Sequence, residues 1–199
     1  MNIGIIGAGS MGSGIAQVAA TAGEEVMVFD TNAASLDKAS ASLTKIMNRL
    51  VEKERVTRKE ADDILGRITF VDSLDYLENS ELVIEAIIEN LEVKQSVFSQ
   101  LEELVSDICI IASNTSSLSI ASISSACKNP ERVIGIHFFN PAPLMKLVEI
   151  IPSISTDQEV TDKAKATIDS WKKVTALVKD TPGFIVNRVA RPFYGEALR

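Results

Sequence analysis

The sequence predicts an α/β fold with a mostly parallel, doubly wound sheet that is covered by helices on both faces. Two observations predict it: short apolar runs rich in β-branched residues recur along the chain, and stretches with helical periodicity separate them. The apolar runs are nearly continuous, which is typical of strands buried on both faces of a parallel sheet. The expected strands are residues 2–6, 25–30, 68–71, 82–86, 108–113, 132–139, 147–151 and 175–179.

The helical stretches fall between these strands, and their crossovers are expected to be right-handed. Gly23 is placed to end the first helix. The long amphipathic stretch from residue 33 to residue 65 predicts two helices with a break near Val56 and Thr57, which form a helical-hairpin insertion. The other expected helices are residues 11–22, 91–105, 120–127 and 157–173.

The composition is that of an acidic globular protein, with 199 residues, 46% hydrophobic residues and a formal net charge of −7. The negative charge argues against a nucleic-acid partner or a membrane surface, but not against an anionic cofactor bound at a helix N-terminus. No apolar run of the sequence approaches a membrane span or a secretory leader, so a cytoplasmic location is expected. Cys109 and Cys127 are expected to be free thiols, the alternative being a disulfide.

A glycine motif joins the first expected strand to the first expected helix. Gly7 permits a tight turn, Gly9 lets a pyrophosphate approach the backbone, and Gly12 lets the helix pack closely on the sheet. Asp30 ends the second strand, where it can bind the ribose hydroxyls of NAD and repel the 2′-phosphate of NADP. This context predicts a Rossmann-type fold that binds NAD, and the alternative is a glycine-rich turn without a ligand. The expected cofactor loop comprises Gly7, Ala8, Gly9, Ser10, Met11 and Gly12.

A loop at Asp180-Thr181-Pro182-Gly183 is the expected domain boundary, because Pro and Gly in succession interrupt regular structure. Residues 1–183 are expected to form the NAD-binding domain. Residues 184–199 are expected to be the first helix of a truncated, all-helical second domain, with Phe184, Ile185, Phe193 and Leu198 exposed. The alternative is a terminal helix that caps the same domain.

Polar residues gather where the later strands end, at residues 114–117, at His137 with Asn140, and at Glu149. Ligands of open parallel sheets bind at that edge. If the chain turns back around Pro143, His137 faces Glu149, and the carboxylate would orient the imidazole and stabilise its protonated form. Spacing alone leaves an alternative open, namely a histidine that ends a strand with its hydrogen bonds satisfied and has no catalytic role.

Several segments then follow one another in a distinctive order. They are I-G-I-I-G-A-G-S-M-G-S-G-I-A, E-A-I-I-E-N, S-N-T-S-S-L, H-F-F-N-P-A-P-L-M-K-L-V-E-I and D-T-P-G-F-I-V-N-R. In order and spacing, across residues 1–191, they resemble the L-3-hydroxyacyl-CoA dehydrogenase family, which includes the bacterial 3-hydroxybutyryl-CoA dehydrogenases. The last three segments together are more specific than the glycine motif.

The resemblance implies an NAD-dependent enzyme that reversibly oxidises L-3-hydroxyacyl-CoA, such as 3-hydroxybutyryl-CoA, to 3-oxoacyl-CoA in fatty-acid or butyrate-type metabolism. It implies that His137 is the catalytic base that removes the proton of the 3-hydroxyl as hydride leaves C3, and that Glu149 orients it. Ser116 and Asn187 are implied to hydrogen-bond the substrate oxygen and the reacting region. The alternatives are a related dehydrogenase of free hydroxy acids or sugar acids, and a fragment that binds NAD without turnover.

The resemblance also implies that Glu89, Lys94, Asn114 and Asn140 lie near the nicotinamide half of NAD, together with Ser116. For Glu89 and Lys94 the alternative is an ordinary exposed ion pair. No metal is implied.

The expected helical hairpin corresponds to a projecting arm of the family that contacts the CoA nucleotide. Lys45, Arg49 and Lys53 share one helix face there, and Lys53 is the implied substrate contact. The alternative is a solvated basic stripe mixed with Glu52 and Glu54. The family's helical second domain mediates dimerisation, so a homodimer through a domain missing from this chain is expected.

Overall fold

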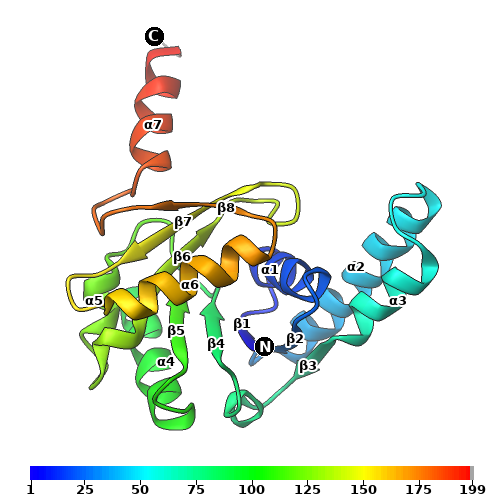
Figure 1. Cartoon of the computed structure of the whole chain (residues 1–199), viewed down its shortest axis with the longest axis horizontal. Coiled ribbons are helices and arrows are strands. Elements are labelled where there is room, and N and C mark those ends of the chain that lie inside the picture. Colours follow the sequence, from blue (N-terminus) through cyan, green and yellow to red (C-terminus); the bar gives the residue numbers. More distant parts are fainter. Residues whose placement is uncertain (198–199) are drawn as a thin grey trace.

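One eight-stranded sheet runs through the computed structural model, which describes residues 1–197, Arg191 by its backbone alone (Figure 1). The strand order is β3-β2-β1-β4-β5-β6-β7-β8. Among the strand pairs within residues 1–197, only β6 and β7 run antiparallel, which confirms the predicted mostly parallel sheet. The strands are β1 (Asn2–Ile6), β2 (Glu25–Phe29), β3 (Ile68–Val71), β4 (Leu82–Glu85), β5 (Ile110–Ser113), β6 (Val133–Phe138), β7 (Leu147–Pro152) and β8 (Val174–Leu177).

The helices cover both faces of this sheet, and each face has its own apolar core. One core takes Ile15, Leu43 and Ile168 from helices on the first face, and the other takes Phe98 and Ile123 from helices on the second. The helices are α1 (Ser10–Thr21), α2 (Ala33–Glu52), α3 (Arg58–Gly66), α4 (Leu91–Leu104), α5 (Ile120–Ser124), α6 (Gln158–Ser170) and α7 (Val186–Ala197), with 3-10 turns at Leu74–Leu77 and Pro130–Arg132.

The topology reverses at β1, which lies between β2 and β4. The chain leaves β1 for β2 and β3 on one side and then continues from β4 on the other side. At such a switch point the connections on the two sides diverge and leave a crevice at the carboxyl ends of the strands, where dinucleotides bind. The glycine loop follows β1 at this point, so the fold places it at the expected crevice.

The helical arm consists of α2 and α3, and it projects from the body of the molecule (Figure 1). The predicted break near Val56 and Thr57 is confirmed, because Thr57 is the N-cap of α3 and forms a capping box with Glu60. Leu43 and Met47 on the inner face of α2 are buried in the core. The arm is therefore held by apolar packing on one face and is solvated on the other.

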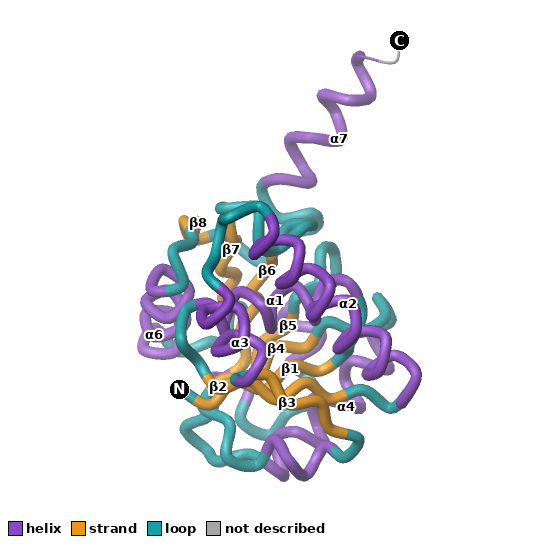
Figure 2. Tube along the Cα trace, turned by 90° about the vertical axis from the view of Figure 1, so that its right-hand side faces the viewer, coloured by secondary structure: helices purple, strands orange, loops and turns teal. Residues whose placement is uncertain are grey.

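The C-terminal helix starts two residues later than predicted. It begins at Val186, and Phe184 adopts a φ of +50° that turns its side chain inward, where it is only 1% exposed. The expected exposure of Phe184 is therefore wrong, whereas Ile185 and Phe193 are exposed and Leu198 lies outside the described residues. Both views show α7 extending away from the sheet (Figures 1 and 2).

The two cysteines are free thiols, as predicted, with Cys109 buried and Cys127 half-buried. Burial raises the pKa of Cys109 to about 12 and that of Cys127 to about 11. Among the helices of residues 1–197, none has the length and apolar character needed to cross a bilayer.

Candidate active site

At two of the three glycine positions in the loop, the surrounding backbone admits only glycine. Gly7 has a φ of +103°, and a Cβ there would lie 2.7 Å from the carbonyl oxygen of Ala86. A Cβ on Gly12 would lie 1.8 Å from the carbonyl oxygen of Gly7, so α1 can pack against β1 only with glycine at this position. These two glycines are explained by the fold itself.

Gly9 is different, because a Cβ built there would meet no atom within 4 Å. Gly9 is also the N-cap of α1, where no side chain caps the helix and the first turn carries no acidic residue. The N–H groups of that turn and the helix dipole are therefore available to an anion. The open space at Gly9 and this uncapped helix end fit the pyrophosphate of a dinucleotide.

Asp30 lies beside the glycine loop, directly after β2. Its Oδ2 accepts a hydrogen bond from the N–H of Ala8 at 2.8 Å, and its Oδ1 accepts one from the N–H of Asn32 at 2.9 Å. The carboxylate is thus fixed at the mouth of the crevice, where it favours ribose hydroxyls over a 2′-phosphate.

His137 and Glu149 face each other across the antiparallel pair β6 and β7, in the register that the turn around Pro143 predicts. The Nδ1 of His137 lies 2.8 Å from Oε2 of Glu149, and both side chains are buried. Oε1 of Glu149 accepts the N–H groups of Ile185 and Val186 at 3.0 and 2.9 Å. Burial favours a raised pKa for Glu149, but the hydrogen bonds from His137, Val186 and Ile185 outweigh it and lower the pKa below its ordinary value.

The imidazole of His137 is enclosed by aromatic rings. The ring centroids of Phe139 and Phe184 lie 4.5 and 5.7 Å from that of His137. Since Glu149 occupies Nδ1, the nitrogen left for a reactant is Nε2. Because its side chain turns inward, Phe184 packs beside the imidazole of His137.

Ser116 and Asn187 are brought together although they are far apart in the sequence. The side-chain Nδ2 of Asn187, in the first turn of α7, donates to the carbonyl oxygen of Ser116 at 3.1 Å. Asn114 ties the end of β5 to β6, since its Oδ1 accepts the N–H of Phe138 at 2.8 Å. Asn140 is exposed just after β6 and lines a cavity together with Gly9 of the glycine loop.

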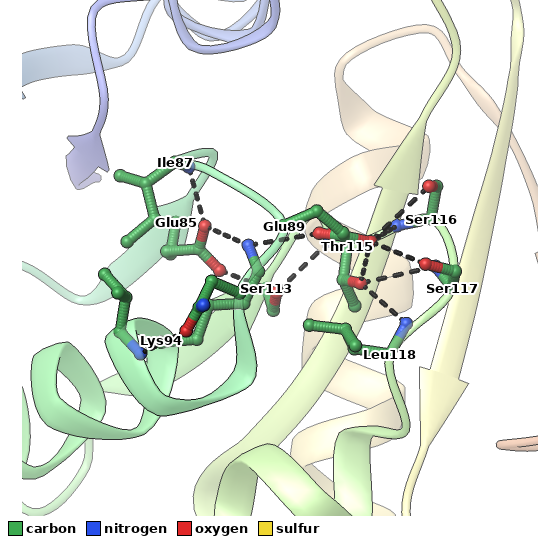
Figure 3. Close-up of polar contacts among 11 residues, drawn as sticks. Glu85, Ile87, Glu89, Lys94, Ser113, Thr115, Ser116, Ser117 and Leu118 are labelled. Carbon is green, nitrogen blue, oxygen red and sulfur yellow. Dashed lines mark hydrogen bonds and ion pairs between the residues drawn. The ribbon is translucent and has the colours of Figure 1, made fainter.

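Lys94 and Glu89 are not the exposed pair that stood as the alternative. Lys94 is 1% exposed, and its Nζ lies 2.5 Å from Oε1 of Glu85 and 3.4 Å from Oε2 of Glu89 (Figure 3). Glu89 accepts hydrogen bonds from the residues that flank and include Ser116. Burial favours a raised pKa for Glu89, but the bond from Thr115, the charge of Lys94 and the bonds from Ser117 and Ser116 together lower it.

Four participants in this network were not predicted as site residues: Glu85, Ser113, Thr115 and Ser117. Thr115 and Ser117 lie within the polar segment 114–117 that follows an expected strand. Glu85 and Ser113 are the last residues of β4 and β5, so each is a polar residue that ends a buried apolar strand. That signal is the same one that singles out Asn114. The same signal marks Glu85, which lies together with Glu89 in the segment E-A-I-I-E-N.

The cavity that Gly9 and Asn140 line has a volume of about 890 Å³ and lies between α1, the inner face of α2 and the loop after β6. The charged residues on its wall, within the described part of the chain, are the lysines Lys38, Lys146, Lys172 and Lys173. Lys173 also fixes that loop, because its Nζ donates to the carbonyl oxygens of Ala142 and Met145 at 2.6 and 2.9 Å. Burial lowers the pKa of Lys173.

Lys53 lies at the C-cap of α2, exposed near the tip of the arm. Lys45 and Arg49 line a separate hollow of about 460 Å³ on α2. The structure therefore does not join these three basic residues to the His137 site through protein contacts.

Comparison with known proteins places this geometry in a family. The family model described as "3-hydroxyacyl-CoA dehydrogenase, NAD binding domain" matches residues 2–181. The chain belongs to this family. The predicted resemblance is thereby confirmed, and with it the NAD cofactor that the glycine loop and Asp30 favour.

Relatives with known names match almost all of the chain. It is 44% identical to the 3-hydroxyadipyl-CoA dehydrogenase of Escherichia coli, over 99% of this chain and 42% of that protein. It is 42% identical to the 3-hydroxybutyryl-CoA dehydrogenase of Bradyrhizobium diazoefficiens, over 98% of this chain and 67% of that protein. The crystal structure of FadB2 of M. tuberculosis superposes with a TM-score of 0.96 at 39% identity, over 99% of this chain and 70% of that one. The chain thus spans from under half to about two thirds of these relatives.

Proposed function

We propose that the protein carrying this chain reversibly oxidises L-3-hydroxyacyl-CoA to 3-oxoacyl-CoA with NAD. The observation that carries the proposal is the buried pair His137 and Glu149, fixed 2.8 Å apart at the sheet edge that also holds the glycine loop. Relatives named 3-hydroxybutyryl-CoA dehydrogenase from several bacteria align with nearly the whole of this chain, which supports a short 3-hydroxyacyl-CoA as substrate.

The pair supplies the proton transfer of the reaction. NAD, when bound, supplies the acceptor for the hydride that leaves C3 of the substrate. Nε2 of His137 takes the proton of the 3-hydroxyl as the C3–O bond becomes a carbonyl. The imidazolium that forms is stabilised by the Glu149 carboxylate at Nδ1, and in the reverse direction it returns the proton to the oxygen. The pair thus serves both directions without a second acid.

Ser116 and Asn187 act in this proposal as the polar groups around the reacting oxygen. Both carry donors, and donors aimed at a developing oxyanion lower the barrier in either direction. Their observed hydrogen bond supports a joint role, since it keeps α7 next to the turn that carries Ser116. Glu89, Asn114 and Asn140 are proposed to border the nicotinamide half of the cofactor, with residues Gly7 to Gly12 and Asp30 at its adenosine half.

The CoA moiety is proposed to extend from this edge toward the arm. An apolar cavity wall whose charged residues are lysines suits an amphiphilic anion such as a CoA ester, in a chain whose net charge is −7. Lys53, with Lys45 and Arg49, is proposed to contact the CoA phosphates.

The domain boundary, the oligomeric state and the cellular location are proposed from the family as well. Residues 1–183 are proposed to be the cofactor domain and residues 184–199 the start of a helical domain that mediates homodimerisation. We place the enzyme in the cytoplasm, in fatty-acid or butyrate-type metabolism, without a nucleic-acid or membrane partner.

The test is NADH oxidation by acetoacetyl-CoA, followed spectrophotometrically with the protein as its natural reading frame encodes it. His137→Ala is expected to lower kcat by about 10²–10⁴-fold, the usual contribution of a general acid–base residue, while calorimetric NAD binding is retained. Near-normal turnover in that variant contradicts the assigned base. A preference for free 3-oxobutyrate over its CoA ester would favour a hydroxy-acid dehydrogenase instead.

A further inference from the structure

A closed ring of polar contacts lies behind the turn that carries Ser116 (Figure 3). It links the ends of two strands, the start of α4 and the turn at residues 114–118. We call it the polar ring. Its members are Glu85, Glu89, Lys94, Ser113 and Thr115.

Glu85 is fully buried, as is Ser113, and it is the charged member of the ring with no exposed surface. Its Oε1 accepts from Nζ of Lys94 at 2.5 Å and from the N–H of Ile87 at 2.6 Å. Its Oε2 accepts from Oγ of Ser113 at 2.7 Å. A buried charge is tolerated only when it is paired and hydrogen-bonded, and Glu85 meets both conditions.

Two routes lead from Glu85 to the turn. On the first, Oγ of Ser113 accepts the N–H of Thr115 at 3.1 Å. On the second, Lys94 reaches Oε2 of Glu89 at 3.4 Å, and Oε1 of Glu89 accepts Oγ1 of Thr115 at 2.6 Å and the N–H of Ser116 at 3.0 Å. The routes meet at Thr115, whose Oγ1 also accepts the N–H of Leu118 at 2.9 Å. Both oxygens of Glu85 therefore act on the backbone beside Ser116.

We propose that Glu85 is a positioning residue that sets the place of Ser116 and of the Glu89 carboxylate. Its buried side chain contacts neither substrate nor cofactor and acts through Ser113 and Lys94. Lys94 acts in the same way through Glu89. The proposal rests on the proposed function only in so far as Ser116 is taken to act on the substrate.

The primary test is amide hydrogen exchange at Ser116 in the ligand-free chain, measured by NMR. Glu85→Gln keeps the shape of the side chain, removes its charge and leaves Lys94 facing a neutral amide. We expect exchange of the Ser116 amide to accelerate by about tenfold or more as the Glu89 hydrogen bond opens more often. Unchanged exchange at Ser116 overturns the proposal, whatever the protein is found to catalyse.

Glu102→Gln is the matched control. Glu102 is another buried carboxylate, on α4 like Lys94, and it accepts the N–H groups of Lys128 and Asn129 at 2.6 Å each. Its loss also weakens the fold, but Glu102 has no contact with the polar ring. Accelerated exchange at Ser116 in both variants to the same degree would show a general loss of stability and would overturn the proposal.

A double variant, Glu85→Gln with Lys94→Met, covers the case in which the single variant folds poorly. It removes the buried ammonium that Glu85→Gln leaves without its partner carboxylate at position 85 and so restores stability, yet it takes from Glu89 its ion pair with Lys94. Exchange at Ser116 is expected to stay fast. Recovery of normal exchange and turnover in the double variant would mean that Glu85 only neutralises Lys94, which contradicts the positioning role.

Turnover provides the second readout. A donor displaced by about 1 Å costs roughly a hundredfold in kcat, so Glu85→Gln is expected to lower kcat by about that factor with the KM for NADH little changed. Glu102→Gln is expected to keep the normal kcat. If the unaltered protein shows no acyl-CoA activity, the proposed function fails, while the exchange comparison still decides the role of Glu85.

Discussion

The active-site edge and the helical arm both carry many charges, but they hold them in opposite ways. At the edge, Lys94 is 1% exposed and its ion-pair partner Glu85 is fully buried. On the arm, the side chains of the pair Arg58 and Asp62 are 56% and 61% exposed. Exposed pairs contribute little to stability, whereas breaking a buried pair is costly. The same kind of charge thus fixes geometry in one region and is free to meet solvent or a ligand in the other.

The arm does not need its charges in order to fold. Leu43 and Met47 on α2 are buried against the body, and the capping box of Thr57 and Glu60 begins α3. The conformation of the active-site edge does depend on its charged and polar side chains, because they hold one another in place through ion pairs and hydrogen bonds. Substitutions of charged residues should therefore have effects that differ by orders of magnitude between the two regions.

The largest effect is expected for Glu149→Gln. If the amide oxygen keeps the N–H groups of Ile185 and Val186, the NH₂ group must face Nδ1 of His137 and donate to it. The neutral imidazole then carries its proton on Nε2, where the base needs a lone pair. We expect kcat to fall by about a thousandfold or more, as for a triad carboxylate changed to its amide. Steady-state kinetics with acetoacetyl-CoA and NADH measure it.

Glu60→Gln on the arm is the control for that variant, since Glu60 likewise accepts a backbone N–H, that of Thr57. Its kcat should stay within about twofold, because glutamine also completes a capping box. Both carboxylates have a pKa below the ordinary 4.5, Glu149 through His137 and backbone N–H groups and Glu60 through Thr57. The stabilisation that each contributes is therefore complete above that pH and is lost as the pH falls through the lowered pKa, so kcat and not the pH dependence of stability separates the two variants. Equal kcat losses in both variants would contradict the contrast between the regions.

The next effect concerns the two kinds of glycine in the cofactor loop. Gly9→Val places a side chain where no protein atom lies within 4 Å, so the fold should tolerate it while the pyrophosphate is blocked. We expect the Kd for NAD to rise by about a hundredfold or more, with the melting temperature within about 2 °C of normal. Calorimetry and thermal unfolding measure the two quantities.

Gly12→Ala should instead lower the stability of the fold more than it weakens NAD binding. Its Cβ would lie 1.8 Å from the Gly7 carbonyl oxygen, so α1 must shift, at a cost of about 1–3 kcal/mol or more in the free energy of unfolding. If Gly9→Val destabilised the fold as much as Gly12→Ala does, the loop would be a structural turn rather than a cofactor cradle.

The sequence could predict those parts that depend on local patterns. The alternation of strands and helices, the glycine loop and the opposition of His137 to Glu149 all follow from short-range spacing, and the register of β6 and β7 agrees with it. An antiparallel hairpin pairs residues by arithmetic once its turn is located. The break in the arm is equally local, because Thr57 and Glu60 are a capping box in the sequence itself.

The rest depends on packing between distant segments, which spacing does not reveal. Lys94 is buried because β4 brings Glu85 to it, and Ser113 at the end of β5 holds that carboxylate. Phe184 is buried because a left-handed turn points it at His137. A charged residue in a polar stretch predicts exposure, and an aromatic residue after a loop does not predict a positive φ.

The smallest effect is expected at the tip of the arm, for Lys53→Ala. Lys53 is exposed and fixes no other residue that the structure describes, so its loss should leave kcat and stability unchanged. Loss of one exposed contact to a CoA phosphate should raise the KM for acetoacetyl-CoA by about three- to tenfold, and this rise should be smaller at high salt. Lys59→Ala is the control, because Lys59 on the same arm is already paired with Asp63 at 2.7 Å. Equal KM changes in both variants would mean that the arm attracts CoA through its general charge. No change in either would leave the arm without a part in binding, and the lysines of the cavity wall would then be the ones to substitute.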